Sequence, residues 1–367
     1  MSSAADRVRS LIHESELSQH DFALRIGLDD SKLSKSLSGT RRFSSLDLAR
    51  IAELCHVSVD WLITGDDQPL AIAARTSGGS AKAALTAAKR LSTMRSDLAT
   101  LGYPQLWQPA NAALGEGRTV DQGKQLAEWA VARVEEAGYT VGANDRAEVV
   151  ERVFGVDVAV IELGTGFDGL AASADDVKLI VLSTSQVPWR QRFTLAHELG
   201  HLLVGDDHGV HLDEDVFAKT QQRDISELRA NAFAASFLMP ADALSDAVGT
   251  MGLTEIGFAS LACDLMVSPS ALAYRLLNLH LIDAGNCDRF RSMSGAKAAH
   301  QVGKTAEWVQ QVARASVRRP PGLLLRDTYA AYEAGATTLR PYADLLGSDV
   351  DELRDALESE AELPDAS

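Results

Sequence analysis

The sequence has little cysteine, no long apolar run and a shortage of positive charge. Its 367 residues include three cysteines, Cys55, Cys263 and Cys287, which form no CxxC pair. This number and spacing exclude a disulfide-stapled scaffold and a thiolate zinc ribbon, and they favour a reducing compartment. No stretch of about 18 uncharged apolar residues occurs, and the N-terminus lacks an apolar core of signal-peptide length. We therefore expect a cytoplasmic protein without a membrane span.

The balance of charge is acidic. The sequence has 35 basic and 51 acidic residues, which gives a formal net charge of −16. This acidity excludes a protein whose whole surface binds nucleic acid, but it allows a small basic face on one domain. The length, with 46% hydrophobic and 23% charged residues, is typical of two or three folded units.

Breaks in the hydrophobic pattern divide the chain into four segments. Short helices are expected in a domain over residues 1–68, followed by a flexible joint and helical linker over 69–145. Short aliphatic runs at 156–160 and 179–182 predict strands within a third domain over 146–290. A helical region with an acidic tail covers 291–367. Longer helices are expected near 81–101, 121–137, 190–204 and 224–238. The predicted fold class is mainly α with a small β-sheet (α+β).

The N-terminal segment has the spacing of a helix-turn-helix. A helix that opens at Ser18 ends at Gly27, and a second short helix covers 31–37. Residues 29–42 hold four basic and two acidic residues, whereas residues 1–66 hold eight and ten. Small hydroxyls and positive charges can approach bases and phosphates, so the predicted DNA contacts are Ser31, Lys32, Ser34, Lys35, Arg41 and Arg42. The alternative is a helical bundle used only for dimerisation or protein contact.

Residues 17–65 resemble the lambda-repressor-like (XRE-type) helix-turn-helix family. The similarity lies in Leu17-Ser18-Gln19, Ile26-Gly27, Lys32-Leu33-Ser34, Leu37-Ser38-Gly39, Ala49, Ile51-Ala52, Val57-Ser58, Trp61-Leu62 and Gly65. The resemblance implies binding to operator DNA, or pairing with a protein that carries a similar domain.

The strongest chemical signal is the sequence His197-Glu198-Leu199-Gly200-His201. Residues four apart lie on one face of a helix, so the imidazoles of His197 and His201 can bind a single zinc ion. Glu198 follows His197 directly and can reach a metal-bound water as a general base. The alternative is a pair of surface histidines on an amphipathic helix.

A third ligand is less clear from the residues alone. A metzincin would have a glycine and a histidine three and six residues after His201, where this sequence has Val204 and Asp207. A carboxylate from a following helix would give the His₂Glu set of many zinc peptidases. Glu227 lies on such a helix, but an ordinary surface carboxylate explains it equally well. His208 and His211 lie in an acidic loop over 205–215, which we interpret as a solvated loop.

The segment around this motif resembles the ImmA/IrrE family of metallo-endopeptidases. The similarity covers about 147–285 and lies in residues 193–203, Glu227, Ala230-Asn231, Phe233-Ala234-Ala235 and Leu238-Met239-Pro240, with Gly169, Leu179-Ile180-Val181-Leu182 and residues 267–279 around them. The resemblance implies that Glu227 is the third zinc ligand. It also implies a substrate, because family members typically cleave a helix-turn-helix repressor and so relieve repression.

The expected protein is therefore a cytoplasmic zinc endopeptidase with its own helix-turn-helix. Its partners would be a repressor or antitoxin-like substrate, operator DNA and, in one arrangement, a second copy in a homodimer. The first alternative is a DNA-binding transcription regulator whose zinc domain is a sensor or a structural module. A second is one half of a toxin–antitoxin pair.

Overall fold

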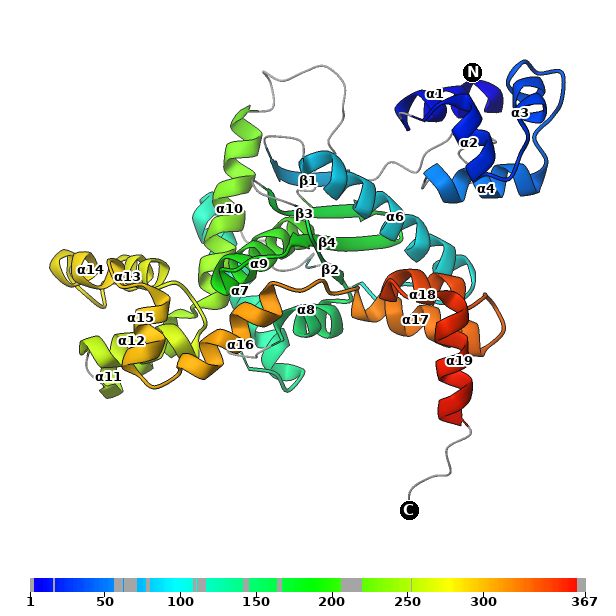
Figure 1. The fold of residues 1–367 in the computed structure, drawn as a ribbon. Coiled ribbons are helices and arrows are strands. Elements are labelled where there is room, and N and C mark those ends of the chain that lie inside the picture. The colour runs from blue at the N-terminus through cyan, green and yellow to red at the C-terminus, as the bar shows by residue number, and fades with distance from the viewer. Residues whose placement is uncertain are drawn as a thin grey trace.

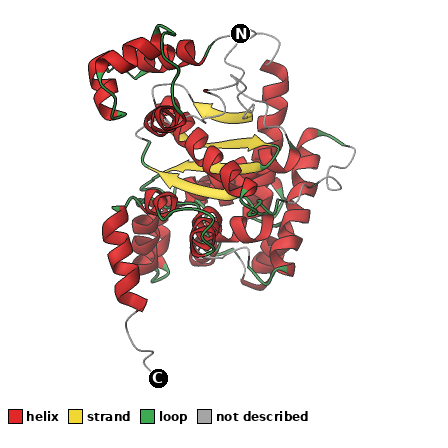
Figure 2. Cartoon of the chain, turned by 90° about the vertical axis from the view of Figure 1, so that its right-hand side faces the viewer, coloured by secondary structure: helices red, strands yellow, loops and turns green. Residues whose placement is uncertain are grey.

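The computed structural model describes residues 3–15, 17–55, 62, 71–76, 80–107, 110, 117–140, 145–163, 167–205, 220–251 and 253–361. Within these ranges helices surround one small sheet (Figures 1 and 2), which confirms the predicted fold class. The helices are α1 (Ala4–Glu14), α2 (Gln19–Arg25), α3 (Asp30–Leu37), α4 (Ser45–Cys55), α6 (Ser80–Thr100), α7 (Thr119–Glu136), α8 (Arg146–Phe154), α9 (Pro188–Val204), α10 (Thr220–Leu238), α11 (Ala241–Met251), α12 (Glu255–Asp264), α13 (Pro269–Asn278), α14 (Ala284–Arg291), α15 (Gly295–Gln301), α16 (Thr305–Ala315), α17 (Gly322–Glu333), α18 (Arg340–Leu346) and α19 (Val350–Ala361).

The sheet has four strands in the order β1-β3-β4-β2, with bounds Ala71–Thr76 (β1), Asp157–Ile161 (β2), Phe167–Ala174 (β3) and Val177–Ser183 (β4). β3 pairs antiparallel with both β1 and β4, and β2 pairs parallel with β4. β2 and β4 lie where aliphatic runs predicted strands. β1 lies in the segment 69–145 for which a flexible joint and helical linker were expected. β3 lies between the two predicted strands and was not predicted, since it has glycine and several alanines but no β-branched residue,.

Alternating side chains bury both faces of this sheet, as the period of two requires. One face, with Val158, Ile180 and Leu182, packs in the core that contains α9 and α10. The opposite face, with Leu179 and Val181, packs against α6 and α17. The first of these cores surrounds the helix that carries the histidine motif, which fixes that helix against a rigid support.

Buried ion pairs hold the C-terminal helices against the sheet. Arg95 on α6 is 1% exposed and binds both carboxylate oxygens of Asp157 at the start of β2, at 2.7 and 2.8 Å. Its third nitrogen donates to Asp327 on α17 at 2.7 Å. A second pair joins Arg319 to Glu151 at the end of α8, at 2.6 Å. Segments from three of the four predicted domains therefore share one core, while the predicted domain boundaries stay a prediction.

The N-terminal helices α1–α4 have a core of their own, built around Phe22, Ile26, Leu33 and Ile51. Ser18 caps α2, and Asp29 caps α3 through the backbone N–H of Lys32 at 2.8 Å,. Gly27 has a φ of 67° between these two helices, a conformation that glycine adopts without strain,. The two helices predicted on either side of Gly27 are present, whereas the assignment to a helix-turn-helix family stays a prediction.

Helices α11–α16 lie beside the sheet core, and α13 packs against both α12 and α14 (Figure 1). Among the described residues, no single helix is long and apolar enough to cross a membrane. One pair, α12 with α13, meets that test together but is bent by 106°.

Candidate metal centre

The histidine motif lies on α9, a helix with clear boundaries. Pro188 occupies its first turn, and Gly205 ends it in the left-handed conformation with a φ of 73°,. His197 and His201 are both buried on the side of the helix that faces α10. Their rings meet edge to face with centroids 4.7 Å apart. The helix therefore holds both imidazoles in one place, as the i and i+4 spacing predicts.

Small residues let α9 come close to its neighbours. A Cβ at Gly200 would lie 2.9 Å from the Phe233 ring of α10, and one at Gly169 would lie 2.6 Å from the Thr194 methyl group. Both distances are shorter than carbon atoms tolerate, so glycine is required at these two positions. The close approach at Gly200 brings the carboxylate of Glu227, on α10, to the two histidines.

The donor atoms of His197, His201 and Glu227 lie at the distances of a shared metal ion. The two Nε2 atoms are 3.1 Å apart, and the Glu227 oxygens lie 3.4 Å from His197 Nε2 and 3.7 Å from His201 Nε2. Zinc binds nitrogen and oxygen at about 2.0–2.1 Å in a tetrahedron, whose ligand atoms are then about 3.3 Å apart. These three donors therefore fit the ion that the residue types predict.

The surroundings favour the protonation states that ligands need. The imidazole of His197, and then that of His201, holds the pKa of the Glu227 carboxyl well below its usual range, so this group is a carboxylate,. Ser226, which is buried, lies with Oγ 3.3 Å from His201 Nδ1. A proton on Nδ1 directed at this hydroxyl leaves Nε2 as the lone-pair donor. Ser226 was not among the predicted site residues, and its only signal in the sequence is its place beside Glu227.

Glu198 is 1% exposed on α9, between the two histidines in sequence. A carboxylate is costly to bury, and this one lies on the helix that carries both histidines,. Its assignment as a general base remains a proposal. His208 and His211, with most of the acidic loop, lie outside the described residues.

The residues predicted to contact DNA divide into two groups. Ser31, Lys32, Ser34 and Lys35 are exposed on α3, and Lys32 pairs with Asp29 at 3.1 Å. Arg42 is exposed, but Arg41 binds the buried Asp47 at 2.8 Å and donates to Ser36 Oγ at 2.9 Å. Arg41 is thus engaged within the module. The DNA contacts stay a prediction.

Comparisons with known proteins address the segment that carries this centre. Residues 152–277 match the model of the IrrE N-terminal-like domain, a peptidase family. This segment resembles an IrrE-type peptidase domain. The match lies inside the 147–285 range of the resemblance seen in the sequence, and it supports the ImmA/IrrE assignment for that segment.

Two curated relatives carry the same description, radiation response metalloprotease IrrE. The protein of Deinococcus radiodurans is 34% identical over 134 residues, which are 36% of this chain and 40% of the relative. The protein of Deinococcus deserti is 33% identical over 153 residues, which are 40% of this chain and 53% of the relative. This chain thus spans about half or less of the length of these relatives.

Proposed function

We propose that this protein is a zinc-dependent endopeptidase. The observation that carries the proposal is the set of distances among His197, His201 and Glu227, since they fit the edges of a zinc tetrahedron,. The match of residues 152–277 to a peptidase family supports it, as does the description of two similar proteins as metalloproteases.

Each residue of the centre has a proposed role. His197, His201 and Glu227 would hold Zn²⁺, which supplies Lewis-acid polarisation of the scissile carbonyl when bound. Glu198 would take the proton of the attacking water and pass it to the leaving amine. Ser226 would orient His201 through its Nδ1 atom,.

The proposed substrate is a helix-turn-helix repressor or an antitoxin-like protein, whose cleavage would relieve repression. Support comes from the resemblance to the ImmA/IrrE family and from the helix-turn-helix spacing of α2 and α3 in this chain. The N-terminal module would bring the peptidase to its target, through operator DNA or through the target's own similar domain. Exposed Lys32, Lys35 and Arg42 suit the first route,.

The decisive experiment compares the wild-type chain with Glu198→Gln. Zinc content is measured by mass spectrometry of the purified protein, and cleavage is measured on purified helix-turn-helix repressors from the same organism. We expect one zinc per chain in both proteins and cleavage in the wild type only. His197→Ala serves as a control that should lose zinc and cleavage together. Cleavage by the Glu198→Gln protein would exclude that carboxylate as the base.

The rival proposal is a transcription regulator whose zinc domain is a sensor or structural module. It predicts stoichiometric zinc with no chelator-sensitive cleavage of any candidate, together with protection of promoter DNA in footprinting. The burial of Glu198 beside the proposed ligands favours the peptidase, because a closed structural site has no use for a buried carboxylate that is not a ligand,.

A further inference from the structure

A second concave site lies away from the metal centre, at the other end of α9. It is a cavity of about 210 Å³ between the first turn of α9, the C-terminal end of α12, and α15 and α16. This volume is below the range of about 300–1,000 Å³ that holds drug-sized ligands, so it suits a molecule of one or two rings. His197 is eight residues further along α9 than Trp189, which is about 12 Å of helix.

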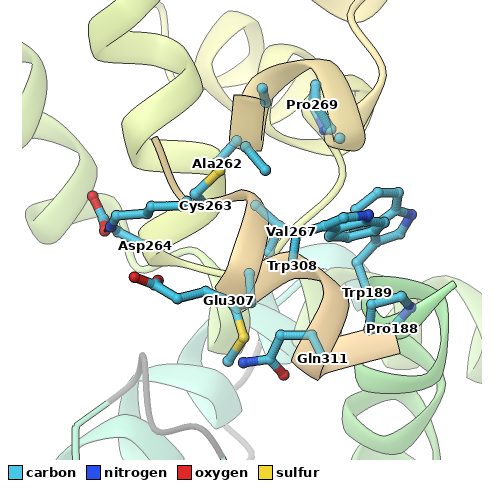
Figure 3. A pocket seen from close by; sticks show the side chains of 15 residues that line it. Pro188, Trp189, Ala262, Cys263, Asp264, Val267, Pro269, Glu307, Trp308 and Gln311 are labelled. Carbon is cyan, nitrogen blue, oxygen red and sulfur yellow. Dashed lines mark hydrogen bonds and ion pairs between the residues drawn. The ribbon is translucent and has the colours of Figure 1, made fainter. Parts of the chain in front are cut away.

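Two tryptophans form one wall of this cavity. The indoles of Trp189 on α9 and Trp308 on α16 are stacked with centroids 4.3 Å apart and an angle of 27°. Both side chains are only half-buried. The Trp189 ring packs directly against Gly295, where an added Cβ would lie 2.1 Å from the ring. This tight contact leaves no room for a side chain at position 295. Figure 3 shows the stacked rings on one side of the cavity.

The opposite side of the cavity is acidic. Figure 3 shows the carboxylates of Asp264 and Glu307 across from the indoles. Asp264 is paired with Lys304, so these two charges cancel. Burial raises the pKa of the Cys263 thiol; the charge of Lys304 opposes this increase, whereas the charges of Asp264 and Glu307 add to it, and the thiol stays neutral,. Glu307 is left as the charge that the other lining groups do not balance.

We infer that this cavity binds a small planar organic cation, with its ring on the Trp189–Trp308 wall and its positive charge toward Glu307. Tryptophan has the most favourable ring face for a cation, and such contacts strengthen where water is excluded. An exposed carboxylate then selects the sign of the ligand charge. This site is independent of the proposed peptidase activity, because none of its lining residues belongs to the metal centre.

The turn between α12 and α13 contributes Met266 and Val267 to the lining of the cavity. Met266 has a φ of 51°, and the Val267 N–H donates to the Ala262 carbonyl at 3.0 Å, which is a common way for a helix to end,.

The test uses two ring systems of similar shape and opposite charge. Calorimetric titration of the full-length protein with 1-methylquinolinium should give saturable binding of one molecule per chain. 1-Naphthalenesulfonate should bind at least about 10-fold more weakly, because it places a negative charge beside Glu307. Trp308→Leu should weaken binding of the cation about 10-fold. Glu307→Gln should weaken it about 3-fold, since this carboxylate is exposed.

Two controls locate the bound cation. Glu352→Gln removes an exposed carboxylate of α19, which is absent from the cavity lining, and should leave binding unchanged. Alkylation at Cys263 is compared with alkylation at Cys55 in the same sample by peptide mapping. When the cation occupies 90% of the protein, the ratio of alkylation at Cys263 to alkylation at Cys55 should fall about 10-fold. Only protein without bound cation then exposes Cys263 to the reagent.

Absence of saturable binding would overturn the proposal. So would binding with an unchanged ratio of alkylation, because the cation would then lie elsewhere. Preference for the sulfonate would overturn the assigned charge of the ligand, and unchanged affinity in both Trp308→Leu and Glu307→Gln would remove the residues on which it rests.

Discussion

Two clusters of charged and titratable side chains lie in the cores on either side of the sheet, and they are built differently. Around Arg95, donors and acceptors are 2.7–2.8 Å apart, and Asp157 accepts further bonds from Gln105 and the Leu324 N–H. Among His197, His201 and Glu227 the separations are 3.1–3.7 Å. Charge-assisted hydrogen bonds are typically about 2.7–2.9 Å. The first cluster is a closed salt bridge, whereas the second has the spacing of ligands around a shared ion.

The contrast between the two clusters requires that Arg95 stabilise the fold. We expect Arg95→Met to lower the free energy of unfolding by about 3–5 kcal/mol, because it leaves Asp157 buried without its partner. Urea unfolding followed by circular dichroism measures this. Arg90→Met, on the same helix, removes only a surface hydrogen bond to the Asp344 carbonyl and should change little. Equal stability of the two variants would contradict the assignment.

Removing the metal tests the other cluster. With free zinc at 100 times the dissociation constant, we expect the wild type to gain about 2.7 kcal/mol over the chelator-treated protein. His197→Ala should abolish this gain, since it removes a ligand. Any Arg95→Met protein that remains folded should keep it, because its zinc ligands are intact. A zinc-dependent gain in the His197→Ala protein would show that the ion binds elsewhere.

A third buried charged residue, Arg146, differs from both clusters. Among the described residues it has no salt bridge, and it is not one of the proposed metal ligands. Arg146 is 3% exposed, and none of its guanidinium nitrogens has a hydrogen-bond partner among the described residues, although Phe237 lies 5.3 Å away. Burial, then the charge of Arg192, lowers the pKa of Arg146 to about 9. We expect Arg146→Met to raise the free energy of unfolding by about 2 kcal/mol at neutral pH.

The sign of the pH dependence follows from that lowered pKa. Between about pH 9 and the unfolded value of 12.5, the native state binds fewer protons than the unfolded state, so the wild type gains stability as pH rises. The difference in free energy of unfolding between the Arg146→Met protein and the wild type should therefore become smaller above about pH 9. A destabilised variant at neutral pH would mean that the guanidinium is satisfied in the native protein.

The smallest expected effect concerns the orientation of a ligand. Ser226→Ala should weaken zinc binding about 10-fold, because His201 Nδ1 loses its hydroxyl partner,. Competition with a chromogenic chelator measures the affinity. Ser236→Ala is the matched control on α10, since Ser236 is also buried but lies outside the metal centre, and its zinc affinity should be unchanged.

The sequence predicted the proximity of His197 and His201 better than it predicted the core around them. Two histidines four apart lie on one helix, so their proximity follows from local geometry. Glu227 needed the family resemblance, because its approach depends on how closely α10 packs on Gly200. Strand β3 was missed because small residues give little strand signal, and its place comes from pairing with β1 and β4,.

The contact between Arg95 and Asp327 could not be read from the sequence at all. These residues are 232 positions apart, and nothing near either one indicates its partner. An arginine within an alanine-rich helix is most often a surface charge,. Only the packing of α6 and α17 on one face of the sheet brings them together.

That separation has a consequence for the newly made chain. After Arg95, a ribosome must add 232 residues to reach Asp327. At about 5–20 residues per second this takes roughly 10–50 s, during which Arg95 lacks its second carboxylate partner. During this interval the incomplete core exposes apolar surface to chaperones and proteases. A chain that ends before α17 leaves Arg95 short of one acceptor permanently. Late truncations should therefore be removed by quality control even though every residue of the metal centre has been synthesised.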